Sequence, residues 1–310
     1  MKTKNKSEVI FLYNKESDSY IVNRAKKSVT NAVIPVMYND KINGLRPVTK
    51  INDKAFVNCN LLTDITLPDT VTYIGRAAFS GCASLKNIVV PNKVSAIYDR
   101  TFKDCTALRE ATLPKTIKKL DKHAFYGCIS LKSVNLGQNL TTLGRQAFYD
   151  CRSLQSIFIS DKIKKIGYQT FYNCTALNNI NLTNNITEIE DDAFFNCTSL
   201  KSINTLENLK HLGRRAFAQS SIQKIVLPDS IIKIEASAFS NCKNLQTVKL
   251  PTKLEKIDDE AFSNCTSLTN INFVPENIRF IGRDAFEGVM AKPVSEWKAY
   301  IAMKSFCLDK

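Results

Sequence analysis

The 310-residue sequence is poor in the residues that interrupt regular structure, with 10 glycines and 9 prolines. This composition excludes collagen-like and low-complexity disordered chains. No run of about 18 apolar residues occurs, so we expect no transmembrane helix. Apolar residues make up 44% of the chain, which is ordinary for a folded protein. We therefore expect a chain that buries a core.

The start of the chain gives a weak export signal. The first residues are basic, but the apolar stretch VIFLY at 9–13 is about half the minimum length of a signal-peptide core. The expectation is either a cytoplasmic protein or a protein whose export signal is not part of these residues.

Phenylalanine recurs at an almost fixed interval. The spacing is 23 residues for seven intervals and then 22, 23 and 24. A fixed period of this size predicts a solenoid, in which each repeat is one coil stacked on the last. The positions are Phe56, Phe79, Phe102, Phe125, Phe148, Phe171, Phe194, Phe217, Phe239, Phe262 and Phe286.

Other positions of the repeat predict the shape of a coil. An aliphatic residue stands five before each Phe, and Ala or Thr stands directly before it, which lets neighbouring coils approach closely. Apolar residues two apart, such as Ile88 and Val90, point to one side of a short strand, and Pro91 should end that strand. Each coil is thus expected to contain a strand, a turn, a second apolar segment, and a brief turn or helix around the Phe.

The ends of the chain depart from the repeat. Two strand-like segments in residues 8–50 suggest a β-hairpin, and EWKAYIAMKSF near the end has helical spacing. We therefore expect an N-terminal hairpin-like cap over 1–50, a solenoid over 51–289 and a C-terminal cap, with helical spacing, over 290–310.

The phrase from Leu62 to Cys82, with its many copies, resembles the BspA-like leucine-rich repeat family, also called the Treponema pallidum type. The resemblance covers roughly residues 33–289. It implies an α/β solenoid, mostly β, which forms an arc of 23-residue coils with a parallel sheet on the concave side. It also implies a surface or secreted adhesin that binds host, matrix or bacterial macromolecules.

Nine cysteines occupy one repeat position. Stacked coils would bring neighbours to about 5 Å, within the Cα separation for disulfides, but an odd column of equivalent residues does not pair. Zinc sites use clusters such as CxxC, which the spacing lacks. We expect reduced, buried cysteines that pack as small hydrophobes with weak S–H donors. They are Cys59, Cys82, Cys105, Cys128, Cys151, Cys174, Cys197, Cys242 and Cys265, and Cys307 lies outside the column.

Motifs for catalysis or cofactor binding are scarce. The two histidines, His123 and His211, stand at different repeat positions without a consistent Ser, Cys or Asp partner. No phosphate loop or dinucleotide fingerprint occurs, and the acidic runs at 190–192 and 258–260 fit solvated turns better than calcium sites. We expect no enzyme activity, no cofactor and no metal.

The outward strand positions are the candidate ligand-binding residues, because they would line the sheet. Most are small, polar and uncharged, which suits contact with a protein or glycan, with Phe158 as an apolar anchor. The alternative is a merely solvated face. The candidates are Thr66, Thr112, Asn135, Phe158, Asn181, Asn204, Lys249 and Asn272, with Val89 and Val226 at the same position.

The net charge of +14 is concentrated in the first half of the chain. Residues 76–165 carry 16 basic and 6 acidic side chains, whereas residues 166–286 carry 12 and 13. We expect this charge on the turns and the far side of the coil, separate from a neutral strand face. The residues on which this expectation rests are Arg76, Lys122, Arg145, Arg214, Arg283, Lys118, Lys119, Lys164 and Lys165.

The sequence thus favours a non-enzymatic, monomeric binding protein of the adhesion type. Two alternatives stay open, an intracellular protein-protein scaffold and an electrostatic binder of nucleic acid or another polyanion. Nucleic acid is the less favoured partner, because no aromatic residues interleave with the basic ones.

Overall fold

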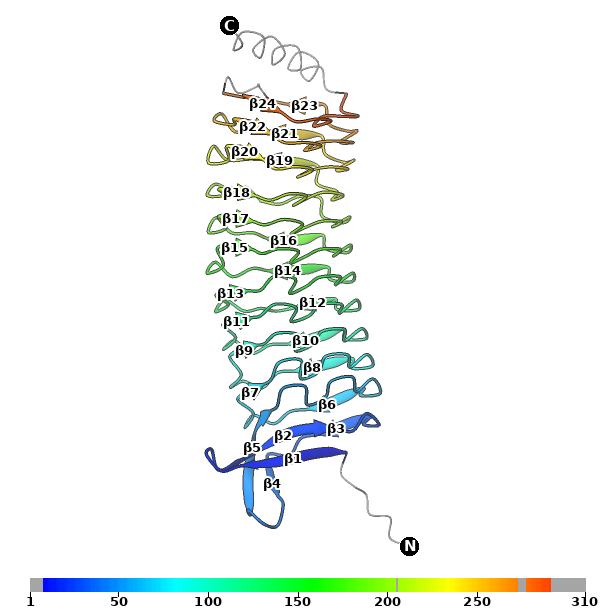
Figure 1. Cartoon of the computed structure of the whole chain (residues 1–310), viewed down its shortest axis with the longest axis vertical. Coiled ribbons are helices and arrows are strands. Elements are labelled where there is room, and N and C mark those ends of the chain that lie inside the picture. The colour runs from blue at the N-terminus through cyan, green and yellow to red at the C-terminus, as the bar shows by residue number, and fades with distance from the viewer. Residues whose placement is uncertain (1–7, 205, 273–276, 291–310) are drawn as a thin grey trace. The chain divides into compact units, whose positions relative to one another are not determined.

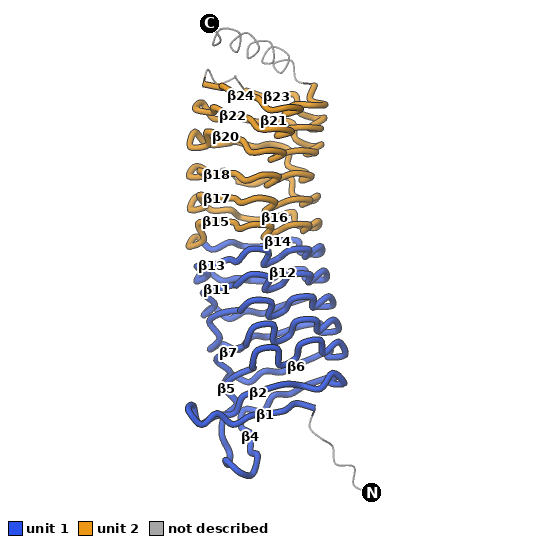
Figure 2. Tube along the Cα trace, in the orientation of Figure 1, with its two compact units in different colours: residues 1–160 blue, residues 161–310 orange. Residues whose placement is uncertain are grey.

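The computed structural model describes residues 8–204, 206–272 and 277–290. The chain divides into two compact units, residues 1–160 and 161–310 (Figure 2). Within each unit, coil follows coil, and every coil contributes short strands to parallel ladders (Figure 1). The predicted solenoid of 23-residue repeats is confirmed.

Unit 1 has two sets of parallel strands. The first strands come after the Leu that follows each Cys, and they are β6 (Asp64–Thr66), β8 (Asn87–Val89), β10 (Glu110–Thr112), β12 (Ser133–Val134) and β14 (Ser156–Phe158). The second strands carry the aliphatic residue before Phe, and they are β7 (Tyr73–Ile74), β9 (Ala96–Ile97), β11 (Lys119–Leu120) and β13 (Thr142–Leu143). Asn87 pairs with Glu110 and Glu110 with Ser133, so the register advances by one repeat per coil.

Unit 2 repeats this arrangement. Its first strands are β16 (Asn179–Asn181), β19 (Lys224–Val226), β21 (Thr247–Lys249) and β23 (Asn270–Ile271). Its second strands are β15 (Lys165–Ile166), β17 (Glu188–Ile189), β18 (His211–Leu212), β20 (Lys233–Ile234), β22 (Lys256–Ile257) and β24 (Phe280–Ile281). The parallel ladders are β19–β21–β23, β15–β17–β18 and β20–β22–β24.

The N-terminal segment of unit 1 joins the same ladders. It contains β1 (Val9–Asn14), β2 (Ser19–Ala25), β3 (Asn31–Val33), β4 (Met37–Asn39) and β5 (Leu45–Ile51). Strands β1 and β2 pair antiparallel, β2 pairs parallel with β5, and β5 pairs parallel with β7. Strand β3 pairs parallel with β6. Its role as a cap stays a prediction.

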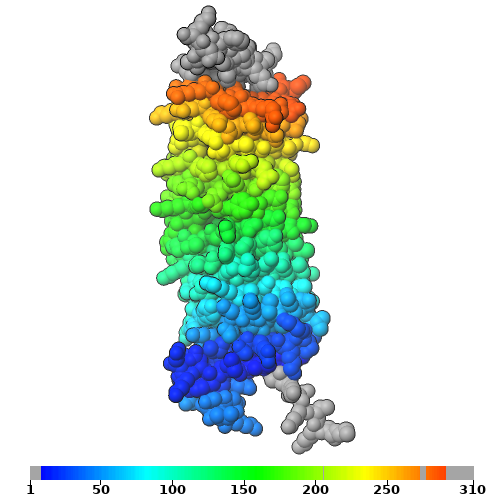
Figure 3. Space-filling view, viewed as in Figure 1, coloured from blue at the N-terminus to red at the C-terminus, as the bar shows by residue number. Residues whose placement is uncertain are grey.

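The phenylalanines form a stacked column in the core of each unit. Successive rings lie 5.1–5.8 Å apart between centroids, with planes within 16° of parallel. Phe194 is fully buried between Phe171 and Phe217. Full burial of one such ring stabilises the fold by a few kcal/mol. Within each unit in Figure 3, the side chains of successive coils form adjacent bands of colour.

Left-handed backbone at the coil corners explains further repeat positions. The second residue after each Phe has a positive φ, as in Asn58 (55°), Gly81 (74°) and Asp104 (58°). Gly, Asn and Asp tolerate this conformation best. The corner around each Phe is therefore a turn. Among the described residues the alternative of a brief helix is wrong, since none of them is helical. The expected C-terminal cap at 290–310 lies outside the described residues except for Met290.

No described stretch forms a helix long and apolar enough to cross a membrane.

Candidate binding face

The outward positions of the first strands in unit 1 form one exposed row. Thr66, Val89, Thr112, Asn135 and Phe158 are all exposed, whereas the residue before each of them packs inward and is largely or fully buried. Val89 is 65% exposed and Phe158 is 51% exposed. The ladder register places Val89 beside Thr112. The predicted strand position therefore gives a continuous outer row in unit 1.

The row includes a residue that the repeat did not predict. Val33 of β3 pairs with Thr66 of β6 and is 77% exposed. It is 33 residues before Thr66 rather than 23, so the fixed period misses it. We call Val33, Thr66, Val89, Thr112, Asn135 and Phe158 the outer row.

In unit 2, two of the candidate amides are engaged with the backbone. The amide of Asn204 accepts a hydrogen bond from the N–H of Leu182 at 3.0 Å and donates to its carbonyl. The amide of Asn272 does the same to Leu250, at 2.6 and 3.3 Å. At the equivalent position of another coil, the N–H of Leu227 donates instead to the backbone carbonyl of Lys249. Asn204 and Asn272 thus hold neighbouring coils together, which reduces their capacity to bind a ligand.

The remaining candidates differ in exposure. Lys249 is exposed at the end of β21, and Asn181 is half-buried at the end of β16. In unit 1, the side-chain oxygen of Asn135 accepts the N–H of Gly137 at 2.9 Å and so shapes the turn after β12. Among the candidate strand positions, the side chains that are exposed and apolar or hydroxylic lie in the outer row of unit 1.

The cysteine column is buried and structural. The thiol of Cys82 donates to the carbonyl of Phe56 at 3.1 Å, and the thiol of Cys242 donates to that of Phe217 at 3.0 Å. Burial raises the pKa of Cys82 to about 12 and that of Cys242 to about 11. A thiol reacts and binds metals as the thiolate, so these groups are inert near neutral pH. All nine column cysteines are free and buried, as predicted.

His123 has partners that the sequence did not predict. Its Nδ1 lies 3.0 Å from Oδ1 of Asp99, and its Nε2 lies 2.8 Å from Oε1 of Gln146, each from a neighbouring coil. The imidazole ring thus bridges a carboxylate and an amide from the two coils on either side of it. His211 is exposed on β18.

The acidic runs make intramolecular contacts. Oδ1 of Asp191 accepts the N–H of Arg214 at 2.8 Å, and Oδ1 of Asp259 accepts that of Arg283 at 2.9 Å. Within the described ranges, no three His, Cys, Asp or Glu side chains gather in a way that could hold a metal ion.

Basic residues near the second strands are partly neutralised. The ammonium of Lys119 lies 3.0 Å from Asp121, and that of Lys165 contacts Glu188 at 3.3 Å and also Glu190. The hydrogen bond from Lys119 lowers the pKa of Asp121, although burial opposes this shift. The charges of Lys119 and Lys165 are therefore paired.

The expected separation of charge from the strand face is wrong. Lys86, Arg109 and Lys132 are exposed and directly precede β8, β10 and β12. Each therefore stands exposed three residues before an outer-row residue, in three consecutive coils. The expectation was based on the basic residues of the turns and second strands, and it left out the basic residue that follows the buried Leu in these three coils.

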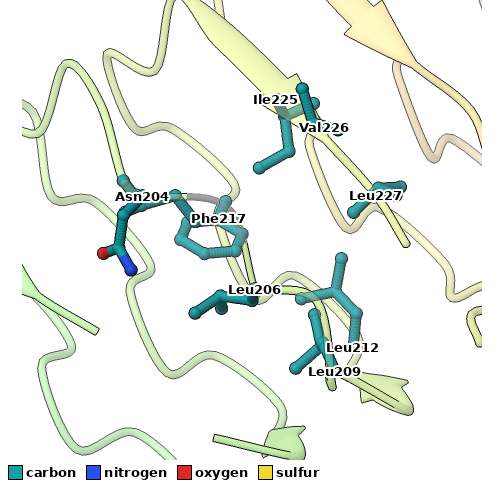
Figure 4. Close-up of a pocket in the computed structure, with 9 residues that line it drawn as sticks. Asn204, Leu206, Leu209, Leu212, Phe217, Ile225, Val226 and Leu227 are labelled. Atoms are coloured by element: carbon teal, nitrogen blue, oxygen red, sulfur yellow. The ribbon is translucent and has the colours of Figure 1, made fainter. Parts of the chain in front are cut away.

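A small hollow lies at the coil in unit 2 whose described residues 201–204 form no strand. About 240 Å³ of space, including its open mouth, lies among Leu206, Leu209, Leu212, Phe217 and β19 (Figure 4). Small-molecule pockets usually combine apolar walls with several polar groups that orient the ligand. Asn204 is the polar side chain in this lining, and its amide is bonded to Leu182. The hollow is thus a packing defect of an irregular coil.

Comparison with known proteins supports the fold. A leucine-rich repeat protein from Bacteroides ovatus is 27% identical, with 91% of each chain covered and a TM-score of 0.72. The T. pallidum leucine-rich repeat protein is 25% identical over 65% of this chain and 92% of that one, with a TM-score of 0.56. A leucine-rich cell surface protein from Faecalibacterium prausnitzii is 24% identical over 86% of this chain and 93% of that one, with a TM-score of 0.49.

No curated protein matches the chain. The model of the BspA type leucine-rich repeat region matches residues 49–178 and 164–291, which together span most of the sequence. This chain therefore belongs to the BspA type leucine-rich repeat family.

Proposed function

We propose that this chain is a non-enzymatic binding protein of the adhesion type, and that the outer row of unit 1 contacts a protein or glycan on a cell surface or in the matrix. The observation that carries the proposal is the exposure of Val33, Val89 and Phe158 in one row. Exposed apolar side chains that gather on one sheet face favour contact with a partner.

The composition of the row suits a macromolecular surface. Thr66, Thr112 and Asn135 separate the apolar side chains and offer hydrogen-bonding groups. Interfaces commonly combine a few apolar anchors with neutral polar groups around them. The row is supported from behind by buried residues such as Ile88 and Ile157, so little conformational entropy is lost when a partner binds.

A binding assay with matched variants tests the proposal. The full chain is applied to immobilised extracellular-matrix proteins and to an array of neutral and acidic glycans. The double variant Val89→Ser/Phe158→Ser should bind its best probe at least about tenfold more weakly, because both anchors are lost. The control Ile129→Ser/Ile232→Ser also removes two exposed aliphatic side chains, away from the row.

The control should bind as the unmodified chain does. Absence of binding to every probe, or equal losses in the two double variants, would overturn the proposed role of the outer row.

A further inference from the structure

Three consecutive coils of unit 1 place a cation at the same position. Lys86, Arg109 and Lys132 each follow a buried Leu and precede a first strand. The N–H of Arg109 bonds to the carbonyl of Lys86 at 2.8 Å, and that of Lys132 to the carbonyl of Arg109 at 3.1 Å. The three residues therefore continue the parallel ladder and are spaced by about 4.8 Å. We call them the basic strip.

The strip has no counter-charge of its own. All three side chains are exposed, and none of them takes part in an ion pair among the residues that the structure describes. On the second strands of the same unit, by contrast, Lys119 is paired with Asp121. Like charges directly opposite each other on neighbouring strands destabilise a sheet. Folding alone therefore does not account for the strip.

The strip is local and not a property of the repeat. The coils on either side have Thr63 and Gln155 at this position. In unit 2 a single cation, Lys201, stands at this position, and the other coils have Asn178, Gln223, Gln246 and Thr269. Two further exposed lysines, Lys93 and Lys115, follow β8 and β10. Positive charge thus precedes the first strand in three coils and also follows it in two of them.

The neighbouring side chains favour a sugar over a nucleobase. Asn87 and Ser133 are exposed at the first residue of β8 and β12, and the outer row adds Thr112 and Asn135. Amides and hydroxyls suit the hydroxyl groups of a glycan. Proteins that bind single-stranded nucleic acid stack bases on aromatic rings, and these three coils have Val89, Thr112 and Asn135 at the outer row instead.

We propose that Lys86, Arg109 and Lys132 bind the sulfate groups of a linear sulfated glycan that runs along the solenoid axis of unit 1, across its strands. The inference deepens the proposed function and rests on it, because the strip borders the outer row. Glu110, exposed beside Arg109, is the acidic side chain of this region and opposes the binding of sulfate.

The test uses a fluorescent heparin octasaccharide titrated with the full chain at several salt concentrations. The variant Lys86→Gln/Arg109→Gln/Lys132→Gln should bind at least about tenfold more weakly and with a shallower salt dependence, since fewer counterions are released. The matched control Arg76→Gln/Lys118→Gln/Arg145→Gln removes the same charge from other exposed positions of unit 1 and should change affinity less than about threefold. Glu110→Gln should strengthen binding.

Several outcomes would overturn the proposal. Equal losses in the two triple variants would indicate a general effect of net charge, and equal binding of desulfated heparin would exclude sulfate recognition. Tighter binding of a single-stranded RNA of equal length would assign the strip to nucleic acid. If heparin fails while Val89→Ser/Phe158→Ser still weakens binding to a matrix probe, the glycan assignment falls and the proposed function stands.

Discussion

The thiol of Cys105 donates a hydrogen bond to the backbone carbonyl of Phe79, one coil earlier, at 3.1 Å. The same bond recurs from Cys128 to Phe102 and from Cys265 to Phe239. Each of these three cysteines therefore links two successive coils through a carbonyl that also accepts the backbone N–H of the cysteine in its own coil. In the coil with Ser220 in this position, the hydroxyl lies 3.4 Å from the Sγ of Cys242. The column is a hydrogen-bonded element of the solenoid.

Replacing Cys105 by Ala should lower the free energy of unfolding by about 1–2 kcal/mol, because the buried carbonyl of Phe79 loses one of its two donors and a small cavity forms. Cys105→Ser should cost less than this, because serine keeps a donor. Guanidinium chloride unfolding followed by circular dichroism measures both. A larger loss in the serine variant would contradict the importance of the hydrogen bond.

The raised thiol pKa values predict a steep loss of stability in alkali. Burial raises the pKa of Cys82 from its ordinary value of 9.0 to about 12, so the folded state keeps its proton longer than the unfolded chain does. Stability from this group is fully present below pH 9 and is lost as pH rises toward 12. Within this pH range, each such thiol lowers the free energy of unfolding by about 1.4 kcal/mol for every pH unit.

The measurement is the denaturation midpoint between pH 7 and pH 10.5, with Cys82→Ala/Cys105→Ala/Cys128→Ala as the comparison. The triple variant should be less stable at pH 7 but should lose stability less steeply above pH 9. Parallel curves for the two proteins would refute the assignment of the alkaline transition to these thiols.

The sequence was sufficient for the core because the same side chain fills the same position in every coil. The period of Phe56, Phe79 and Phe102 fixes the stacking, and the alternation of Ile88 and Val90 fixes the strand. These are local patterns that repeat unchanged, so each copy confirms the others.

The outer face was less predictable, because its features depend on which coils are neighbours. Val33 joins the outer row through a 33-residue connection, and Asn204 turns to the backbone of Leu182 in a coil without a first strand. That Lys86 and Arg109 lie side by side on neighbouring coils is evident only when the register is known. Surface properties of a solenoid arise from such comparisons between coils.

Phe194→Ala should lower the free energy of unfolding by about 3–5 kcal/mol, since the ring is fully buried and stacked on both sides. The control Phe158→Ala removes an exposed ring and should change stability by less than about 0.5 kcal/mol. Thermal unfolding followed by circular dichroism compares them. Similar losses in both variants would contradict the placement of the Phe column in the core.

Gly75→Ala tests how closely the corners of successive coils approach. A Cβ atom on Gly75 would lie 2.4 Å from the backbone nitrogen of Asp53, and the backbone cannot easily withdraw, because Gly75 N–H bonds to Ile51 and Arg76 N–H bonds to Asp53. We expect a loss of about 2 kcal/mol or more, as for other overpacked sites.

Gly137→Ala is the matched control, because its φ is 68° and its Cβ would meet nothing within 4 Å. That variant should cost about 1–2 kcal/mol for the left-handed backbone alone. Chemical denaturation of both variants separates steric exclusion from backbone strain. If Gly75→Ala proved the milder change, the coils would have to separate at this corner more readily than their hydrogen bonds indicate. The glycine that follows the aliphatic residue in five coils (Gly75, Gly144, Gly167, Gly213 and Gly282) would then need another explanation.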